Sequence, residues 1–217
     1  ASLQGETYTS QVLLPKPEQP VINYAEETLT VTLPEGALPE GVEVEDITVN
    51  IQCEGKTYLY YSRMTGMSMD IPLSTIAMYI GITLPSVDEN ATALSVYYSI
   101  DSADYTEIAR SEVTDFTIPA RPDINVDTVY PGYNEMTVTF DTEPYNVYLQ
   151  SVKEPEKYFY DEDDGVVDGC IHGLTEGTEY TVHFRVPPTE DSFASIPYLL
   201  DKTYTTLTRT RLSDEAA

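Results

Sequence analysis

The sequence predicts an all-β protein of two tandem β-sandwich domains, and three observations lead to this class. The composition favours strands, because 18 Tyr and many Val and Thr suit a pleated, half-buried surface. Hydrophobic residues make up 41% of the 217 residues, which is enough for packed cores. One strand pattern is also written twice, about 100 residues apart, which is the size of one sandwich domain. Helical periodicity is nowhere sustained, and the best helical candidate, Leu73 to Gly81, spans one or two turns at most.

The repeated pattern consists of a proline, a short apolar strand, a polar turn and a strictly alternating strand. The first copy runs from Pro20-Val-Ile22 to Leu29-Thr-Val-Thr-Leu33. The second copy runs from Pro122-Asp-Ile124 to Met136-Thr-Val-Thr-Phe140. Two copies of one pattern predict two domains of the same kind.

The junction before each copy recurs as well. It reads as an extended segment at 7–17 and at 114–122, each running into prolines, and a third version at 203–209 closes the chain. Prolines keep such links extended and stiff. The predicted organisation is an N-terminal extended strand 1–15, a first sandwich 16–119, a second sandwich 120–210 and a C-terminal tail 211–217.

Short alternating runs bounded by turn residues predict the strands. In the second domain they lie near 123–129, 134–141, 145–151, 157–160, 166–171, 178–187 and 199–207. In the first domain they lie near 20–24, 27–33, 46–53, 56–62, 67–72, 78–84 and 113–118. Two further runs, 94–101 and 105–110, are interpreted as a hairpin inserted before the closing strand.

The second domain resembles a fibronectin type III module. The resemblance is carried by the run Gly173-Leu-Thr-Glu-Gly-Thr-Glu-Tyr-Thr-Val-His-Phe-Arg-Val186, in which Tyr180 follows Leu174 by six positions. The resemblance implies a tyrosine corner, in which the ring is buried and the hydroxyl bonds to backbone across the turn. The chain departs from the family at Glu176, where proline is usual, and at Phe140, where tryptophan is usual.

The first domain shows only an echo of this motif, because Leu73 and Tyr79 have the same spacing but Gly81 and Thr83 follow where apolar residues are expected. It is interpreted as immunoglobulin-like and as a divergent type III module. The resemblance implies modules that serve as spacers, adhesive units or accessory domains in extracellular chains. It implies no particular ligand, since a fold does not fix a function.

The chain is strongly acidic, with 11 basic and 37 acidic side chains and a formal net charge of −26. Phosphate backbones and anionic lipid surfaces would be repelled, so no nucleic-acid partner is expected. No apolar run is long enough for a membrane span, and none is expected. Solubility is the simplest reason for such a charge.

Calcium is the cation that the acidic loops would suit, because hard cations take six to eight oxygen ligands. The candidate ligands are Asp161, Asp163, Asp164 and Asp168, which crowd one predicted turn. A second acidic loop carries Glu35, Glu40, Glu43, Glu45 and Asp46. The first loop lacks the spacing of an EF-hand loop and has no Glu at its twelfth position, so the sequence favours solvated turns and no cofactor.

The other side chains with chemistry are few. His172 and His183 are predicted on strands, without a cysteine or third histidine recognised at ligand spacing, which argues against zinc and against a catalytic triad. Cys53 and Cys170 fall in different domains and are expected to be buried thiols. With no cleft expected in sandwiches of this size, the chain is predicted not to be an enzyme.

Aromatic residues cluster in the first domain at Tyr58, Tyr60, Tyr61, Tyr97 and Tyr98. They would either form a flat platform for sugar rings or pack between strands, and strand alternation favours packing.

The N-terminal segment is a candidate for strand addition through Tyr8, Val12, Leu13 and Leu14. Three fates are open for it: pairing with its own domain, pairing with another chain or a preceding domain, and a frayed terminus. These features predict a secreted, non-catalytic structural module that builds or spaces a cell-surface or filament assembly, with other protein domains or identical subunits as partners. The alternatives are an adhesin that binds a glycan or host protein, and an accessory part of a larger secreted hydrolase.

Overall fold

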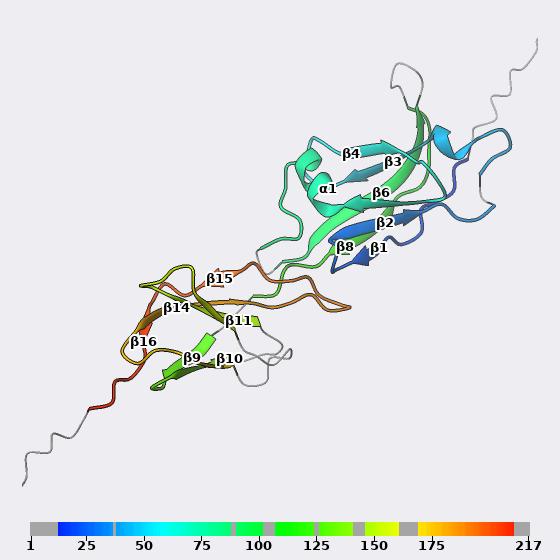
Figure 1. Cartoon of the computed structure of the whole chain (residues 1–217). Coiled ribbons are helices and arrows are strands. Elements are labelled where there is room, and N and C mark those ends of the chain that lie inside the picture. Colours follow the sequence, from blue (N-terminus) through cyan, green and yellow to red (C-terminus); the bar gives the residue numbers. More distant parts are fainter. Residues whose placement is uncertain are drawn as a thin grey trace, which may run out of the picture. The chain divides into compact units, whose positions relative to one another are not determined.

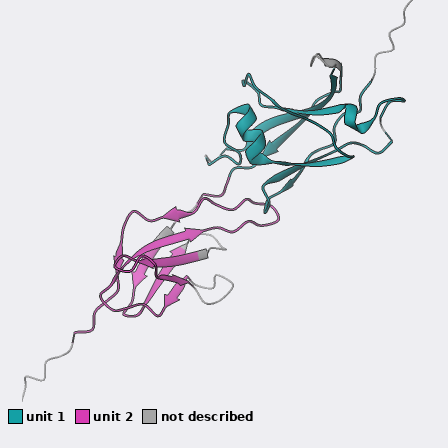
Figure 2. Ribbon diagram, turned by 45° about the horizontal axis from the view of Figure 1, so that its top comes forward, with its two compact units in different colours: residues 1–120 teal, residues 121–217 magenta. Residues whose placement is uncertain are grey.

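The computed structural model describes residues 13–36, 38–87, 90–101, 107–123, 126–140, 146–160 and 169–210, without the side chains of 107, 108, 126, 127, 140 and 146. The chain divides into two compact units, Ala1–Ala120 and Arg121–Ala217 (Figure 2). Both are built from β-sheets, so the all-β class of tandem sandwiches is confirmed.

Unit 1 contains a three-stranded and a five-stranded antiparallel sheet (Figure 1). The small sheet has the order β1-β2-β5, and the large sheet has the order β4-β3-β6-β7, with β8 also paired to β6. The elements are β1 (Val21–Asn23), β2 (Thr28–Thr32), a 3-10 turn (Val44–Asp46), β3 (Ile47–Gln52), β4 (Tyr60–Arg63), β5 (Ser68–Pro72), α1 (Leu73–Ile80), β6 (Thr92–Asp101), β7 (Glu107–Arg110) and β8 (Thr114–Ile118).

Strict alternation builds the core of unit 1. On β2, Leu29 and Val31 are buried, while the hydroxyl of Thr30 on the outer face donates to Asp70 Oδ1 at 2.6 Å. β3 and β6 lie in the middle of the large sheet, and Ile47 and Tyr98 are fully buried. The alternating pattern thus sorts side chains to the two faces as the period of a strand requires.

The expected strand at 78–84 is wrong, because the chain forms the helix α1 there. Leu73, Ile76, Ala77 and Ile80 are buried at helical spacing, and the helix contacts β4 and β5. Gly81 ends it in the left-handed conformation with a φ of 75°, and its N–H donates to the carbonyl of Ala77 at 2.9 Å. Leu73 and Tyr79, whose spacing resembles that of a tyrosine corner, therefore both lie in the helix α1 and form no such corner.

The two expected strands at 94–101 and 105–110 do form an antiparallel pair, β6 and β7, but the interpretation of this pair as an insertion is wrong. β6 is the central strand of the large sheet, paired on one side with β3 and on the other with β7 and β8. β7 and β8 pair with successive stretches of the same edge of β6, and residues 111–113 separate them. Ser111 holds the interruption, because its N–H donates to the Tyr98 carbonyl and its hydroxyl accepts from the Tyr98 N–H, both at 2.9 Å.

Unit 2 has the same strand order. Its sheets have the orders β13-β10-β9 and β12-β11-β14-β15, with β16 also paired to β14. In place of the single strand expected at 199–207, the chain forms two short strands, β15 and β16. The elements are β9 (Val126–Pro131), β10 (Glu135–Phe140), β11 (Asn146–Ser151), β12 (Tyr158–Tyr160), β13 (Cys170–His172), β14 (Glu179–Arg185), β15 (Tyr198–Leu199) and β16 (Tyr204–Thr205).

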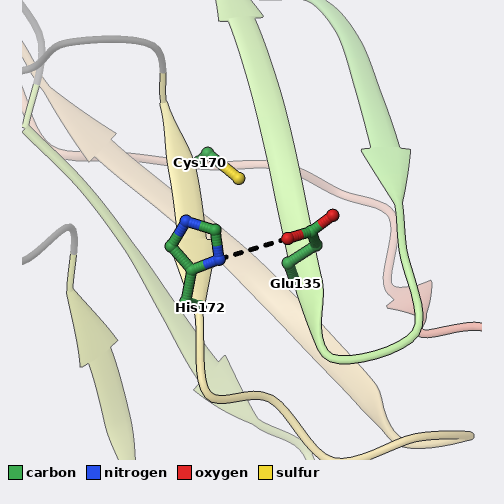
Figure 3. A group of neighbouring side chains, drawn as sticks. All are labelled: Glu135, Cys170 and His172. Atoms are coloured by element: carbon green, nitrogen blue, oxygen red, sulfur yellow. Dashed lines mark ion pairs between the residues drawn. The ribbon is translucent and has the colours of Figure 1, made fainter.

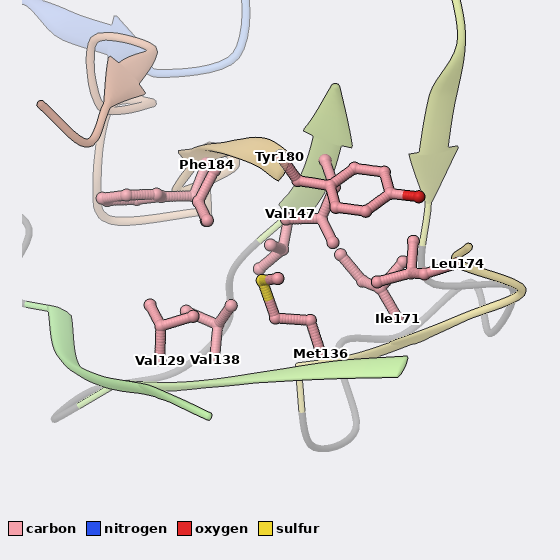
Figure 4. Packing of buried hydrophobic residues seen from close by; sticks show 10 residues of the cluster. Val129, Met136, Val138, Val147, Ile171, Leu174, Tyr180 and Phe184 are labelled. Atoms are coloured by element: carbon pink, nitrogen blue, oxygen red, sulfur yellow. The ribbon is translucent and has the colours of Figure 1, made fainter. Parts of the chain in front are cut away.

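The core of unit 2 lies between its two sheets. Figure 4 shows Met136 and Val138 from β10 pointing toward Val147, Tyr180 and Phe184 from the facing sheet. Because these inward positions alternate with outward ones, the same strands carry a second row of side chains to the opposite faces. The two outer faces of unit 2 therefore carry its candidate sites.

Candidate functional site

Tyr180 lies at a corner that fixes the start of β14. Its side chain is 1% exposed, and its hydroxyl oxygen accepts a hydrogen bond from the Thr175 backbone N–H at 2.9 Å. Leu174 is buried beside it (Figure 4). The rings of Phe159 and Tyr180 pack edge to face, with centroids 5.6 Å apart. This is the geometry of a tyrosine corner, and its role is structural.

The outer face of the large sheet in unit 2 carries four rings in contact, which we call the tyrosine ladder: Tyr148, Tyr158, Tyr160 and His183. Strand register makes it, since Tyr148 on β11 lies opposite Tyr160 on β12 and opposite His183 on β14. Tyr148 and His183 stack with centroids 4.5 Å apart and planes 9° apart. Tyr160 follows at 5.7 Å from Tyr148, and Tyr158 at 5.8 Å.

The ladder is accessible and uncharged. Tyr158 is 47% and Tyr160 is 61% exposed. Partial burial lowers the pKa of His183, so its imidazole stays neutral at neutral pH. Burial, then the neighbouring Tyr158 and Tyr160, raise the pKa of Tyr148. On a chain with a net charge of −26, this is a neutral strip on a rigid sheet.

The arrangement of the rings decides what the ladder can contact. Tyr148 has His183 on one side and Tyr160 on the other, so neighbouring rings occupy both of its faces. The rings and hydroxyls of Tyr158 and Tyr160, which are 47% and 61% exposed, are therefore the parts of the ladder open to a partner. Exposed tyrosines of this kind are enriched in protein–protein interfaces.

For the tyrosines of unit 1 the sequence favoured packing between strands over a platform, and the ladder of unit 2 was not predicted. In unit 1, Tyr60, Tyr97 and Tyr98 are buried, while Tyr58 and Tyr61 are 72% and 54% exposed, so packing between strands prevails over a platform. The signal for the ladder was the alternation Tyr158-Phe-Tyr160 facing Tyr148 across a hairpin. It becomes visible only when the register is known.

A second cluster that sequence reasoning missed lies on the outer face of the small sheet of unit 2. Glu135, Cys170 and His172 bring one carboxylate oxygen, one sulfur and one ring nitrogen within 4.8 Å of one another (Figure 3). The expectation that His172 has no cysteine at ligand spacing is wrong, because Cys170 precedes it by two residues on the same strand and face. Both cysteines are partly exposed, so the expectation of buried thiols is also wrong.

The four aspartates Asp161, Asp163, Asp164 and Asp168 lie outside the described residues, as do Tyr8 and Val12. Of the N-terminal segment, Leu13 is 83% exposed and Leu14 is buried. Residues 13–15, the described end of the expected strand 1–15, form no strand and lead through Pro15 into Pro17. In the second acidic loop, Glu43 and Asp46 cap the 3-10 turn.

No family model and no curated protein match the sequence. Among solved structures, a two-domain fibronectin type III segment of chicken tenascin matches with 13% identity and a TM-score of 0.31, over 88% of this chain and 99% of that one. The FN1–FN3 domains of chicken CNTN1 match with 12% identity and a TM-score of 0.34, over 90% of this chain and 68% of that one.

The strand order of the two units and the corner at Tyr180 define the class: tandem sandwiches of fibronectin type III-like architecture. In the described parts of the chain, no helix is long and apolar enough to cross a membrane. In the parts of the chain that the structure describes, the two outer faces of unit 2 carry the tyrosine ladder and the cluster of Glu135, Cys170 and His172.

Proposed function

We propose that the chain is a non-catalytic structural module that builds or spaces an extracellular or cell-surface assembly. The observation that carries this proposal is the tandem repetition of one strand order in two units. Repeated sandwiches set distances between other parts of an assembly without a ligand of their own.

The connection between the units supports a spacing role. β8 ends at Ile118 and β9 begins at Val126, and Pro119 and Pro122 lie between them. Prolines limit the conformations of a link, so its end-to-end distance varies less than that of a Gly/Ser-rich link. The high negative charge keeps such a module soluble and limits adventitious contacts with anionic surfaces.

Localisation tests this proposal directly. Antibodies against the chain should label intact cells of the source organism or detect the chain in its medium, and external protease should remove the signal. A cytoplasmic protein followed in the same samples controls for lysis. A signal that appears only after the cells are broken would overturn the proposal. A catalytic domain encoded beside this segment in the parent gene would instead favour the accessory role.

The tyrosine ladder favours a second candidate function, a binding module for a protein partner. We infer that this partner presents a neutral surface with polar groups for the Tyr158 and Tyr160 hydroxyls, because the strip itself is uncharged. Binding should therefore change little between low and moderate salt, unlike binding driven by the acidic charge.

The variants for this test are Tyr148→Ser and Tyr160→Ser, and the matched controls are Tyr58→Ser and Tyr130→Ser, which alter exposed tyrosines away from the ladder. A partner cross-linked to the chain in the extracellular fraction should be lost with the ladder variants and kept with the controls. Retention by all four variants would exclude the ladder. Capture of a glycan that depends on the ladder would assign it to sugar binding instead.

A further inference from the structure

The cluster of Glu135, Cys170 and His172 is assembled by the pairing of β10 with β13. Glu135 lies directly opposite His172, and Thr137 lies directly opposite Cys170. Since residues two apart on a strand share a face, the two rungs place all four side chains on the outer face of the small sheet. Figure 3 shows Cys170 and His172 side by side on β13, with Glu135 reaching toward them from β10.

The three donors form the kind of ligand set that zinc takes. Thiolate sulfur, imidazole nitrogen and carboxylate oxygen all bind zinc, with bonds of about 2.0 to 2.3 Å. In a tetrahedral site, this places ligand atoms roughly 3.3 to 3.8 Å apart. His172 Nδ1 and Glu135 Oε2 are already 3.2 Å apart, and the three ligand atoms lie within 4.8 Å of one another. Side-chain rotation is therefore enough to close them around one ion.

The surroundings hold two of the ligands in place. The Thr137 hydroxyl donates a hydrogen bond to Cys170 Sγ at 3.4 Å, which orients the sulfur. Gly132 leaves room for Glu135, because a Cβ at position 132 would lie 2.7 Å from Glu135 Cγ. Gly169, with a φ of 64°, precedes the short strand β13, and its carbonyl accepts from the Val138 N–H at 3.0 Å.

We propose that Glu135, Cys170 and His172 form a zinc site on the outer face of unit 2, with water as the fourth ligand. The site discriminates against calcium and magnesium, because a thiolate and an imidazole are poor ligands for hard cations. Selective zinc binding at this site therefore differs from the nonselective attraction of divalent cations by the net negative charge of the chain, which salt screens.

Calorimetry with zinc chloride and the whole chain tests the site. We expect one saturable site per chain that persists in excess calcium. Cys170→Ser and His172→Ala should abolish it. The chain supplies a matched control for each variant, since Cys53 is the other cysteine and His183 the other histidine. Cys53→Ser and His183→Ala should bind zinc as the unaltered chain does.

Two further measurements identify the ligands by their chemistry. Cobalt(II) in place of zinc should produce a sulfur-to-metal charge-transfer band that Cys170→Ser removes and Cys53→Ser leaves. Thr137→Val, which removes the hydroxyl at nearly constant volume, should weaken zinc binding about tenfold. Affinity should also fall as the pH is lowered, because the ligands must release protons to bind the metal.

Three results would overturn the proposal. They are the absence of saturable zinc binding, binding that calcium displaces, and binding that survives both Cys170→Ser and His172→Ala. Circular dichroism of each variant without metal shows that a lost site does not reflect an unfolded domain. Because Cys170 and His172 are partly or largely exposed, both substitutions should leave unit 2 folded.

Discussion

Among the tyrosines that the structure describes, Tyr98 and Tyr180 are fully buried, and they use their hydroxyls in opposite ways. Tyr180 accepts a hydrogen bond from Thr175 N–H, whereas Tyr98 donates one to the Thr32 carbonyl at 2.8 Å. Each hydroxyl satisfies a backbone group at a place where the chain leaves its sheet. A buried aromatic residue with a polar tip therefore serves both packing and backbone satisfaction in each unit.

Tyr180→Ala should destabilise unit 2 by about 3 to 5 kcal/mol, because it removes a large ring that is 1% exposed. Tyr180→Phe should cost only about 1 kcal/mol, since it keeps the ring and removes one hydrogen bond. Urea unfolding followed separately for the two units would measure both, with Tyr130→Ala as an exposed control. Unchanged unfolding of unit 2 in Tyr180→Ala would refute the structural role of the corner.

Tyr98 should make unit 1 sensitive to alkaline pH. Burial, and secondarily the negative charge of Glu18, raise the pKa of Tyr98 above its ordinary value of 10.0. The folded state therefore keeps the proton that the unfolded chain loses, so this stabilisation is present below about pH 10 and is lost as the pH rises above it. Thermal melting of unit 1 between pH 8 and 11, compared with Tyr98→Phe, measures the effect. An equal alkaline loss in both proteins would assign it to other groups.

Among the elements, α1 shows how two periodicities compete in one segment. Residues 78–84 alternate well enough to predict a strand, but Leu73, Ile76, Ala77 and Ile80 bury a helical face. Gly81 decides the outcome at the C-terminus, because its φ of 75° is strained for any residue with a Cβ.

Gly81→Ala should therefore destabilise unit 1 by about 1 kcal/mol, even though open space surrounds the position. Gly66→Ala is the matched control, because its φ lies outside the positive range and its surroundings are also open. Equal melting temperatures for the two variants would contradict the conformational argument.

Single strands and their faces could be read from the sequence, and sites made by two strands could not. On β14, the buried Tyr180, Val182 and Phe184 alternate with less buried residues, and such alternation can be read from a sequence because the strand period depends only on local order. Glu135 meets His172, and Tyr148 meets Tyr160, only through the register of paired strands. The register depends on turns and on core packing, which a single sequence does not state.

At the scale of the whole molecule, one strand order serves two units that differ in the connection from the last strand of the small sheet to the large sheet. In unit 1 the helix α1 connects β5 to β6, and in unit 2 the turn closed by Tyr180 connects β13 to β14. The sequence repeat was visible at β1–β2 and β9–β10, where both units keep the same pattern. The repeat is not visible in the connection between the sheets, because the two units bury different side chains there. Unit 1 buries one face of a helix, and unit 2 buries a single tyrosine ring.

The N-terminal segment offers a test of how the chain closes its first unit. Leu14 is 3% exposed and Pro17 is buried, and the hydroxyl of Thr114 on β8 donates to the Pro17 carbonyl. Residues 14 to 17 are thus held by unit 1 itself, which favours the first of the three fates considered for residues 1–15. The neighbouring Leu13 is 83% exposed and makes no such contribution.

Two deletions, of residues 1–14 and of residues 1–12, distinguish the three fates, because only the longer one removes the buried Leu14. Removal of residues 1–14 should lower the melting temperature of unit 1 without changing the mass in solution, since truncating a buried leucine alone costs about 2 to 5 kcal/mol. Removal of residues 1–12 should leave both nearly unchanged, and Leu14→Ala should reproduce most of the larger deletion. Light scattering and thermal melting measure the two quantities. Oligomers that dissociate when only residues 1–12 are removed, with unit 1 still folded, would instead assign the segment to strand addition between chains. Equal melting for all three variants and the unaltered chain would leave a frayed terminus and contradict the packing of Leu14.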